Sequence, residues 1–225
     1  MKKLAFIFLL ILASAEVAQC QNFYKDMVTP KNQAQVSSGP SFIYANTSGR
    51  IRTLGFKILP SMALAYSHQI NPHLTLRGTT SVQWLQSNLK MSQEVKERWG
   101  QQSKAYGFQG QAFYADFMPM LQLFPARHQG ATVNAYAGAG LGWLHVNSSQ
   151  FSIINQGMVE KKANINTAYV PIRAAIGKKL NDSIELLMEG TFMATFSDQL
   201  DGNNGKKRVR NDHLLQGHVA LKKFF

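Results

Sequence analysis

Hydrophobic and polar residues alternate along most of this chain with a period of two. Between Ser183 and Ser197, for example, Ile, Leu, Met, Gly, Phe, Ala and Phe occupy every second position, with mostly polar residues between them. Such alternation is typical of β-strands that have two unlike faces. It predicts eight strands, over Gln35–Asn46, Gly55–Gln69, His73–Gln86, Tyr106–Phe124, Val133–Asn147, Thr167–Leu180, Ser183–Ser197 and Asp212–Phe225.

The connections between these segments alternate strictly between long and short. The short ones lie at residues 71–72, 125–131 and 181–182, and they contain the Asn, Pro, Asp and Gly residues of tight turns. The long ones lie at residues 47–54, 87–105, 150–166 and 198–211, and most are rich in charge. Short turns at one end and long loops at the other are typical of outer-membrane barrels. We therefore expect an all-β fold, an eight-stranded antiparallel up-and-down transmembrane β-barrel.

The polar set of each strand indicates which face points inward. A water-soluble barrel shows the same period, but its polar face is in water and favours long charged side chains. Here the polar set is dominated by small residues, such as Ser61, Ala63, Thr79, Gly140 and Gly177. The interior of an eight-stranded barrel is just wide enough for side chains to fill it. The pattern therefore predicts small residues in the lumen and an apolar face toward lipid.

The charged residues of the inward set have both signs, and buried charges need partners. We expect them to form ion pairs that plug the lumen, with Arg173 and Glu185 as one pair on adjacent strands. A conducting pore would need a wider barrel. The expected lumen residues are Lys57, Arg77, Asp116, Arg173, Glu185, Glu189 and Lys222. The in-strand prolines Pro60, Pro119 and Pro171 must mark bulges or strand ends, because proline removes a ladder hydrogen bond.

The N-terminus indicates export. Lys2 and Lys3 precede an apolar run that is too short to span a membrane, so residues 1–20 are interpreted as a signal peptide. Cys20 is either the last residue removed or a lipid-modified first residue. We expect a periplasmic lead-in over residues 21–34 and the barrel domain over residues 35–225. The formal net charge is +12, with only 16% charged residues. The predicted location is the outer membrane.

No motif predicts a cofactor, a metal site or catalysis. The glycines of AGAGLG at residues 137–142 continue within a strand, whereas a dinucleotide fingerprint must open a helix. The six histidines show no metal-ligand spacing. An enzyme at the outer rim could be imagined from His145, Ser148, Ser149 and Asp198, but their spacing does not support it. We expect no enzyme activity and no nucleic-acid partner.

The densest basic run is KKRVR, at residues 206–210, and it has two interpretations. It is either a solvated loop or a contact with the phosphates of surrounding lipopolysaccharide, since cations gain charge-assisted contacts there. The residues of this proposed contact are Lys206, Lys207, Arg208 and Arg210.

At the other end of the barrel, the chain ends on a strand whose last residue, Phe225, fits an interfacial aromatic girdle. A terminal aromatic also resembles the signal that barrel-assembly machinery reads.

Four segments carry a family resemblance: residues 71–88 (NPHLTLRGTTSVQWLQSN), 107–126 (GFQGQAFYADFMPMLQLFPA), 133–147 (VNAYAGAGLGWLHVN) and the terminal LLQGHVALKKFF. Their layout resembles the small outer-membrane barrels of Bacteroidota, of the OmpA/OmpX-like type, and their order is similar to that of the PorG-type barrel associated with the type IX secretion system. Asp116 stands where that family often carries a glutamate, while its glycine- and aspartate-rich first hairpin is absent here. The resemblance implies a structural or assembly component that contacts periplasmic secretion-ring proteins. The alternatives are a lipopolysaccharide-modifying enzyme and a loop-mediated adhesin or receptor.

Overall fold

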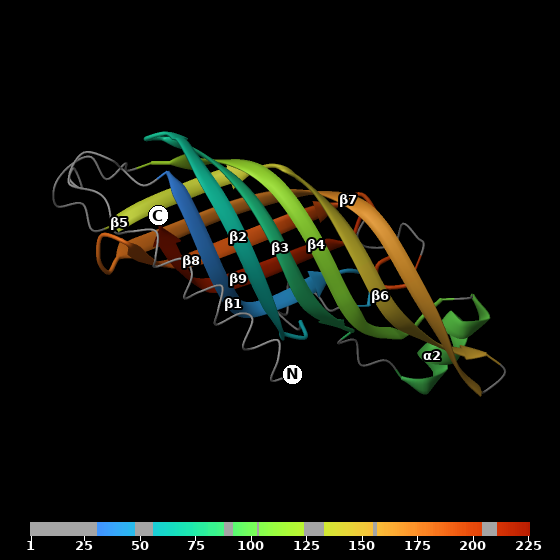
Figure 1. Ribbon diagram of the computed structural model, residues 1–225. Coiled ribbons are helices and arrows are strands. Elements are labelled where there is room, and N and C mark those ends of the chain that lie inside the picture. Colours follow the sequence, from blue (N-terminus) through green and yellow to red (C-terminus); the bar gives the residue numbers. More distant parts are fainter. Residues whose placement is uncertain are drawn as a thin grey trace, which may run out of the picture. The chain divides into compact units, whose positions relative to one another are not determined.

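A computed structural model describes residues 31–47, 56–87, 92–102, 104–123, 133–154, 157–203 and 211–225. The expected signal peptide, most of the lead-in and the basic run at residues 206–210 lie outside these ranges. The described part of the chain forms β-strands and a single helix (Figure 1). Their bounds are β1 Asn32–Tyr44, β2 Leu59–Asn71, β3 Leu74–Gln86, α2 Gln93–Gln101, β4 Gly107–Gln122, β5 Val133–Ala139, β6 Leu141–Ile154, β7 Gly157–Lys179, β8 Ile184–Thr195 and β9 His213–Phe224.

The strands close into an antiparallel ring. Each strand pairs with its neighbour in sequence, and β1 pairs with β9 from Gln33 opposite Phe224 to Tyr44 opposite His213. β5 and β6 share one place in the ring, between β4 and β7. The ring therefore has eight strands, as the alternation predicted. We call the end where β1 begins and β9 ends the proximal end, and the opposite end the distal end.

The break between β5 and β6 is an interruption of the ladder at Gly140, across which the register with β4 and β7 does not shift. A side chain there would meet the carbonyl oxygen of Phe117 at 2.2 Å, so only glycine fits without a shift. The ladders on both sides skip this point, from Phe117 to Met120 on β4 and from Tyr169 to Ile172 on β7. Pro119 and Pro171 lie in these gaps, within β4 and β7 rather than at the expected bulges or strand ends, and Pro171 O accepts from the N–H of Gly140 at 3.1 Å. Pro60, the second residue of β2, lies at a strand start.

Burial alternates along the strands, except in the distal hairpin of β6 and β7, and this alternation separates the two faces of the wall. Small and polar residues are buried inside, including Ser37, Ser61, Ala63 and Thr79. Large apolar residues are exposed outside, and they follow the ring through β1, β2, β4, β6, β7, β8 and β9. This apolar belt includes Val36, Met62, Leu64, Phe113, Phe117, Leu121, Leu141, Trp143, Ile172, Ile176, Met188, Val219 and Leu221.

Several boundaries differ from the expectation, among them the start of β2 at Leu59 rather than at residue 55. β1 begins at Asn32, inside the expected lead-in. The third long connection is largely strand, because β6 and β7 pair as far as Ile154 opposite Gly157. The second long connection contains α2, which packs with Gly100 against the backbone of Ile153 in β6 (Figure 1). No helix in the described residues has the length and apolar character that a membrane-spanning helix needs.

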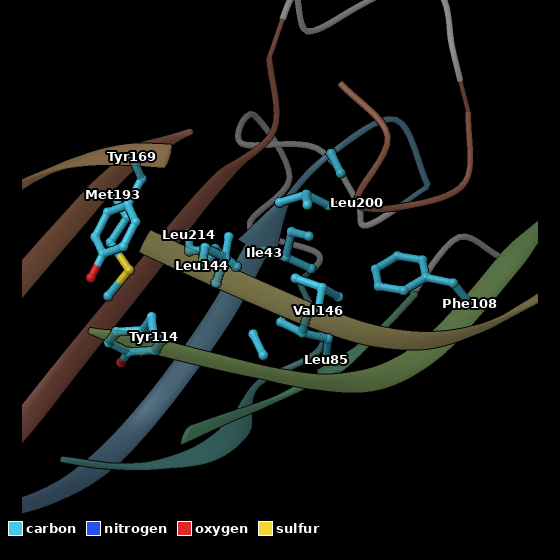
Figure 2. Packing of buried hydrophobic residues seen from close by; sticks show 12 residues of the cluster. Ile43, Leu85, Phe108, Tyr114, Leu144, Val146, Tyr169, Met193, Leu200 and Leu214 are labelled. Carbon is cyan, nitrogen blue, oxygen red and sulfur yellow. The ribbon is translucent and has the colours of Figure 1, made fainter. Parts of the chain in front are cut away.

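An apolar cluster fills the distal part of the lumen, which the sequence reasoning did not anticipate. Its side chains come from β1, β3, β4, β6, β7, β8, β9 and the connection after β8, and they converge on one another (Figure 2). Its members are Ile43, Ala45, Leu85, Phe108, Ala112, Tyr114, Leu144, Val146, Tyr169, Met193, Leu200 and Leu214. These side chains are at most 5% exposed, so this part of the barrel is packed like a protein core.

Candidate functional site in the barrel lumen

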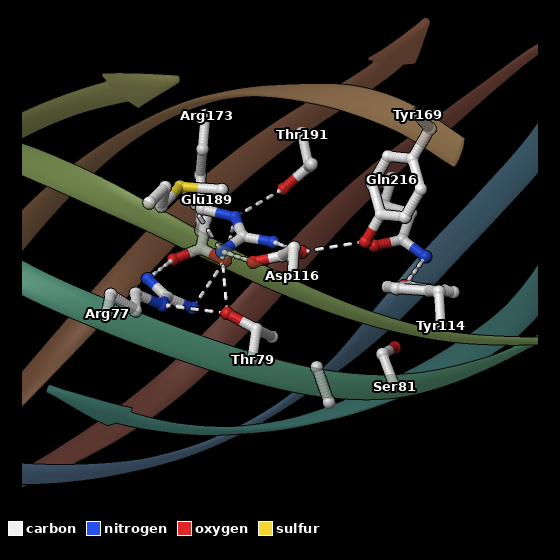
Figure 3. A network of polar contacts seen from close by, with 12 residues as sticks. Arg77, Thr79, Ser81, Tyr114, Asp116, Tyr169, Arg173, Glu189, Thr191 and Gln216 are labelled. Atoms are coloured by element: carbon white, nitrogen blue, oxygen red, sulfur yellow. Dashed lines mark hydrogen bonds and ion pairs between the residues drawn. The ribbon is translucent and has the colours of Figure 1, made fainter. Parts of the chain in front are cut away.

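A four-membered ion network crosses the middle of the lumen (Figure 3). Arg77 of β3 donates to both carboxylate oxygens of Glu189 of β8, at 2.6 and 3.0 Å. Arg173 of β7 donates from Nη2 to Asp116 of β4 at 3.1 Å, and its Nε lies 3.3 Å from Glu189 Oε1. All four residues are at most 6% exposed. Two cations and two anions make the network neutral, which is what burial of such groups requires.

Neutral side chains complete the coordination of these charges. Thr191 accepts from Arg173 Nε at 3.0 Å, and Thr79 accepts from Arg173 Nη1 at 2.8 Å. Tyr169 donates to Asp116 at 2.9 Å, and Gln35 donates to Glu189 at 3.3 Å. Arg173 is therefore bound to residues of β3, β4 and β8, and Glu189 to residues of β1, β3 and β7, so the network ties several strands of the wall together.

Glycine makes room for the tyrosine of this network. A side chain at Gly142 would lie 2.4 Å from the ring of Tyr169, which stands opposite it on β7. This agrees with the expectation of small residues in a lumen that side chains fill. Tyr169 itself was missed by the sequence reasoning, although it alternates in phase with Arg173 on the same strand.

A second ion pair lies nearer the proximal end. Lys222 of β9 contacts Glu185 of β8 at 3.1 Å. Tyr136 donates to Glu185 Oε2 at 2.8 Å, and Asn134 donates to Oε1 at 2.9 Å. The Lys222 ammonium also lies 3.7 Å from the centre of the Tyr136 ring, a cation–π contact. Lys222 and Glu185 therefore close the lumen below the central network.

Two placements differ from the sequence-based expectation. Arg173 does not contact Glu185, because Arg173 lies opposite Thr191 whereas Glu185 lies opposite Lys179. At 3.3 Å per residue these positions are about 20 Å apart along the strands. Lys57 precedes β2 and is exposed, so it does not belong to the buried charges. The remaining six expected lumen residues are all buried.

His218 of β9 occupies the lumen beside two serines. Its Nε2 lies 2.7 Å from Ser61 Oγ, and its Nδ1 lies 3.3 Å from Ser37 Oγ. All three side chains are at most 4% exposed. The two serines contact the two ring nitrogens of His218, and all three residues are buried, so they are part of the packing of the lumen.

The connection after β8 covers the distal mouth, and we call residues 198–203 the distal cap. Leu200 inserts into the apolar cluster, and its N–H donates to Asp212 at 2.8 Å. Asp201 accepts from the N–H of Thr47 at 2.9 Å, and Asn203 donates to the carbonyl of Ala105 at 3.1 Å. The cap is thus fixed to the segments that follow β1, precede β4 and precede β9. The sequence reasoning treated it only as a charged loop.

Burial raises the pKa of Asp201 in the cap and of Asp212, which the cap contacts. Desolvation, followed by repulsion from Asp201 and Asp198, raises the pKa of Asp212 to about 8. Burial also raises the pKa of Asp201, against the hydrogen bonds from Asn203 and Thr47. At neutral pH the Asp201–Asp212 pair therefore retains a proton, which lowers the cost of burying two carboxyls together.

The rim residues considered for catalysis do not assemble. Ser148 is buried on the inner face of β6, whereas His145 and Ser149 lie on its outer face. His145 and Ser149 are about 13 Å apart at 3.3 Å per residue, and His145 Nδ1 lies 2.7 Å from Asn166 Oδ1. Among the described residues no group of three or more His, Cys, Asp or Glu side chains could hold a metal ion.

At the seam, the terminal residue closes the ring. The N–H of Phe225 donates to Asn32 O at 3.0 Å, and the N–H of Asn32 donates to Phe225 O at 3.2 Å. The Phe225 side chain is exposed beside Tyr66. The last residue is thus paired in the sheet rather than frayed, with its aromatic ring on the outer surface.

No protein-family model matches the chain, and no curated protein sequence matches it. The fold is similar to that of several solved structures. Neisserial surface protein A superposes with a TM-score of 0.53 and 11% identity, over 86% of this chain and 97% of that one. Ail of Yersinia pestis, in complex with the heparin analogue sucrose octasulfate, gives 0.50 and 10%, over 88% and 100%. A major outer membrane protein of Thermus thermophilus gives 0.50 and 12%, over 86% and 99%. At these identities the likeness shows the fold alone: the chain has the eight-stranded barrel fold seen in small outer-membrane proteins.

Proposed function

We propose that this chain is a non-conducting outer-membrane barrel that acts as a structural or assembly component. The observation that carries the proposal is the filled lumen. Two ion-paired layers, an apolar cluster and a cap follow one another from the proximal to the distal end. The described residues leave no aqueous path through a lumen filled in this way, and the proposed contribution of the barrel therefore comes from its surfaces.

The apolar belt supports the membrane location. Water-soluble proteins rarely expose contiguous apolar patches beyond a few hundred Å², whereas this belt follows the ring through most of the strands, with residues such as Leu141 and Met188 more than 70% exposed. Lipid solvates such a surface. With the signal peptide interpreted from the sequence, the proximal end with its short turns faces the periplasm and the long connections face outward.

The narrower proposal concerns assembly partners. The resemblance to the PorG-type barrel supports a role in a type IX-like secretion system, with the short turns at the proximal end as the contact with periplasmic ring proteins. Phe225, exposed at the end of the closing strand, supports recognition by barrel-assembly machinery. A non-enzymatic role is part of this proposal, because the described rim side chains do not form a nucleophile–base pair.

Site-specific photocrosslinking tests the assembly role. A crosslinking residue at Asp182, in the short turn between β7 and β8, should capture periplasmic proteins in intact cells. The same residue at Lys161, exposed near the distal hairpin, is the matched control and should not capture them. If neither position gives a crosslinked periplasmic protein in cells that export and fold the barrel, the assembly role is wrong, although the barrel itself would stand.

A further inference from the structure

The outer surface of the barrel changes character toward the distal end of β3, β4, β6 and β7. Phe113 is the last large apolar residue that points outward on β4, and on β6 Trp143 is followed by the outward His145, Asn147 and Ser149 before Phe151; Phe113 and Trp143 are 44% and 58% exposed. Beyond them, the outward positions carry amides: Gln111 and Gln109 on β4, and Asn147 on β6. This boundary lies where the apolar belt ends.

The strand register arranges these polar residues in two rows across four adjacent strands (Figure 1). In the first row Trp84 lies opposite Gln111, Gln111 opposite Asn147, and Asn147 opposite Asn164. In the second row Gln86 lies opposite Gln109, Gln109 opposite Ser149, and Ser149 opposite Lys162. Neighbouring strands are about 4.8 Å apart, so the side chains of each row are in reach of one ligand.

A groove of about 510 Å³ follows these rows. We call it the amide groove, and its outward residues are Trp84, Gln86, Gln109, Gln111, Asn147, Ser149, Lys162 and Asn164. Gln109, Gln111, Asn147, Asn164 and Lys162 are exposed. The described residues that line the groove include one lysine and no carboxylate, so its formal charge is positive.

The chemistry of the groove suits a saccharide that carries phosphate. Each amide offers two N–H donors and a carbonyl acceptor, which matches sugar hydroxyls because these both donate and accept. Trp84 supplies a partly exposed aromatic surface with an N–H at its edge, and such side chains serve interfaces that are part apolar and part wet. Lys162 supplies a cation for an anionic substituent, with a charge-assisted contact.

We propose that the amide groove binds the phosphorylated sugar portion of lipopolysaccharide in the surrounding outer leaflet. The position of the groove argues for a membrane-anchored ligand, because its first row begins directly beyond the apolar belt, at the level of lipid headgroups. Basic pockets at that level bind lipid headgroups in other membrane proteins. The inference rests on the proposed outer-membrane location, and it goes beyond the scaffold role by assigning a ligand class and the residues that hold it.

The test measures binding of purified lipopolysaccharide to the folded full-length barrel in lipid nanodiscs, at fixed ionic strength. The double variant Gln111→Ala with Asn147→Ala should bind about tenfold more weakly, since it removes two amides that lie opposite each other. Lys162→Glu should weaken binding to a similar degree. Lys178→Glu is the matched control, because Lys178 is exposed on the same strand near the proximal end, and its affinity should stay within about twofold of the parent.

Three outcomes would overturn the proposal. The first is equal lipopolysaccharide affinity for the parent, the groove variants and Lys178→Glu. The second is binding of phosphatidylglycerol by the parent barrel with the same affinity as lipopolysaccharide, which would mean that the groove attracts any anionic lipid. The third is equal affinity for the free core oligosaccharide, which would make the ligand a soluble saccharide. Heat-modifiable migration of each variant on a gel separates these results from failure of the barrel itself, since an unfolded variant shows no shift.

Discussion

At the scale of single residues, the lumen is organised by charge balance. Arg77 and Arg173 share Glu189, while Arg173 also holds Asp116, so each buried charge has an opposite charge within 3.3 Å. Attraction of this kind offsets desolvation only when the set is complete, and removing one partner leaves a buried charge uncompensated.

Replacement of Glu189 by glutamine should therefore destabilise the barrel by about 3–5 kcal/mol. The change leaves Arg77 and Arg173 with Asp116 alone, a net charge of +1 in the network. The double variant Arg77→Met with Glu189→Gln restores neutrality and should be more stable than Glu189→Gln. Urea unfolding in lipid vesicles, followed by heat-modifiable migration, measures both.

Glu160→Gln is the matched control for this series, because Glu160 is exposed near the hairpin between β6 and β7. It makes the same chemical change and should alter the free energy of unfolding by less than about 0.5 kcal/mol. Equal stability of Glu189→Gln and Glu160→Gln would show that the network does not stabilise the fold.

The sequence predicted which residues face the lumen but not which of them pair. Alternation assigns a face to Arg173, Glu185 and Glu189 without ambiguity, because the period is two. Partners depend on the register between strands and on reach across the barrel, and neither leaves a local pattern. Arg173 therefore meets Glu189 and Asp116, and Lys57 falls outside the lumen because β2 begins two residues after it.

Asp212 gives the cap a pH dependence. Its folded pKa, about 8, lies above the usual value near 4, so the folded state binds more protons than the unfolded state between these pH values. Stability then falls as pH rises from about 4 to 8, on the order of 1 kcal/mol per unit, and levels off above the folded pKa.

Asp212→Asn should flatten this dependence, since the amide keeps the hydrogen-bonding oxygen without the charge. The measurement is the free energy of unfolding across pH 4 to 9 for both proteins. Asp182→Asn, in an exposed short turn, controls for the loss of one carboxylate. A parent and an Asp212→Asn variant with parallel pH profiles would contradict the raised pKa.

At the scale of elements, the interruption at Gly140 shows what a single glycine permits. β5 and β6 form one strand of the ring with a break, and the ladders on both sides skip the same point near Pro119 and Pro171 without a shift of register. The three prolines were expected at bulges or strand ends; Pro60 lies at a strand start, whereas Pro119 and Pro171 lie within strands beside this interruption.

Gly140→Ala should destabilise the barrel by about 1–3 kcal/mol, because its methyl group would overlap the carbonyl oxygen of Phe117. Gly78→Ala is the matched control in β3, where an added side chain meets nothing within 4 Å. The measurement is the unfolding midpoint of each variant in urea, which should be lower for Gly140→Ala than for Gly78→Ala. Equal midpoints would mean that this position does not need glycine.

The extension of β6 and β7 was missed for a physical reason. In the proposed membrane location, this distal hairpin extends beyond the lipid, so the residues of Gly157–Asn166 lack the apolar period that marks a lipid-facing strand. Backbone pairing alone continues the hairpin to Ile154 and Gly157. The sequence pattern predicts strands where lipid and lumen impose two different environments on their faces, and it does not predict them where both faces meet the same solvent.

At the scale of the whole molecule, the central ion network, the apolar cluster and the cap follow one another along the lumen in the described part of the chain. The proposed function follows from this filling, because it leaves rim, groove and turns to make the interactions. The apolar belt supports a membrane location through physical chemistry, while the likeness to solved barrels shows only the fold.

Conductance across a planar lipid bilayer tests the central claim most directly. The purified, folded chain should insert into the lipid, and heat-modifiable migration of the protein recovered from that lipid checks the insertion. It should then give no current above that of the bare bilayer at voltages of either sign. Stable, stepwise currents that scale with salt concentration would contradict the closed lumen, and with it the proposal that the barrel acts through its surfaces.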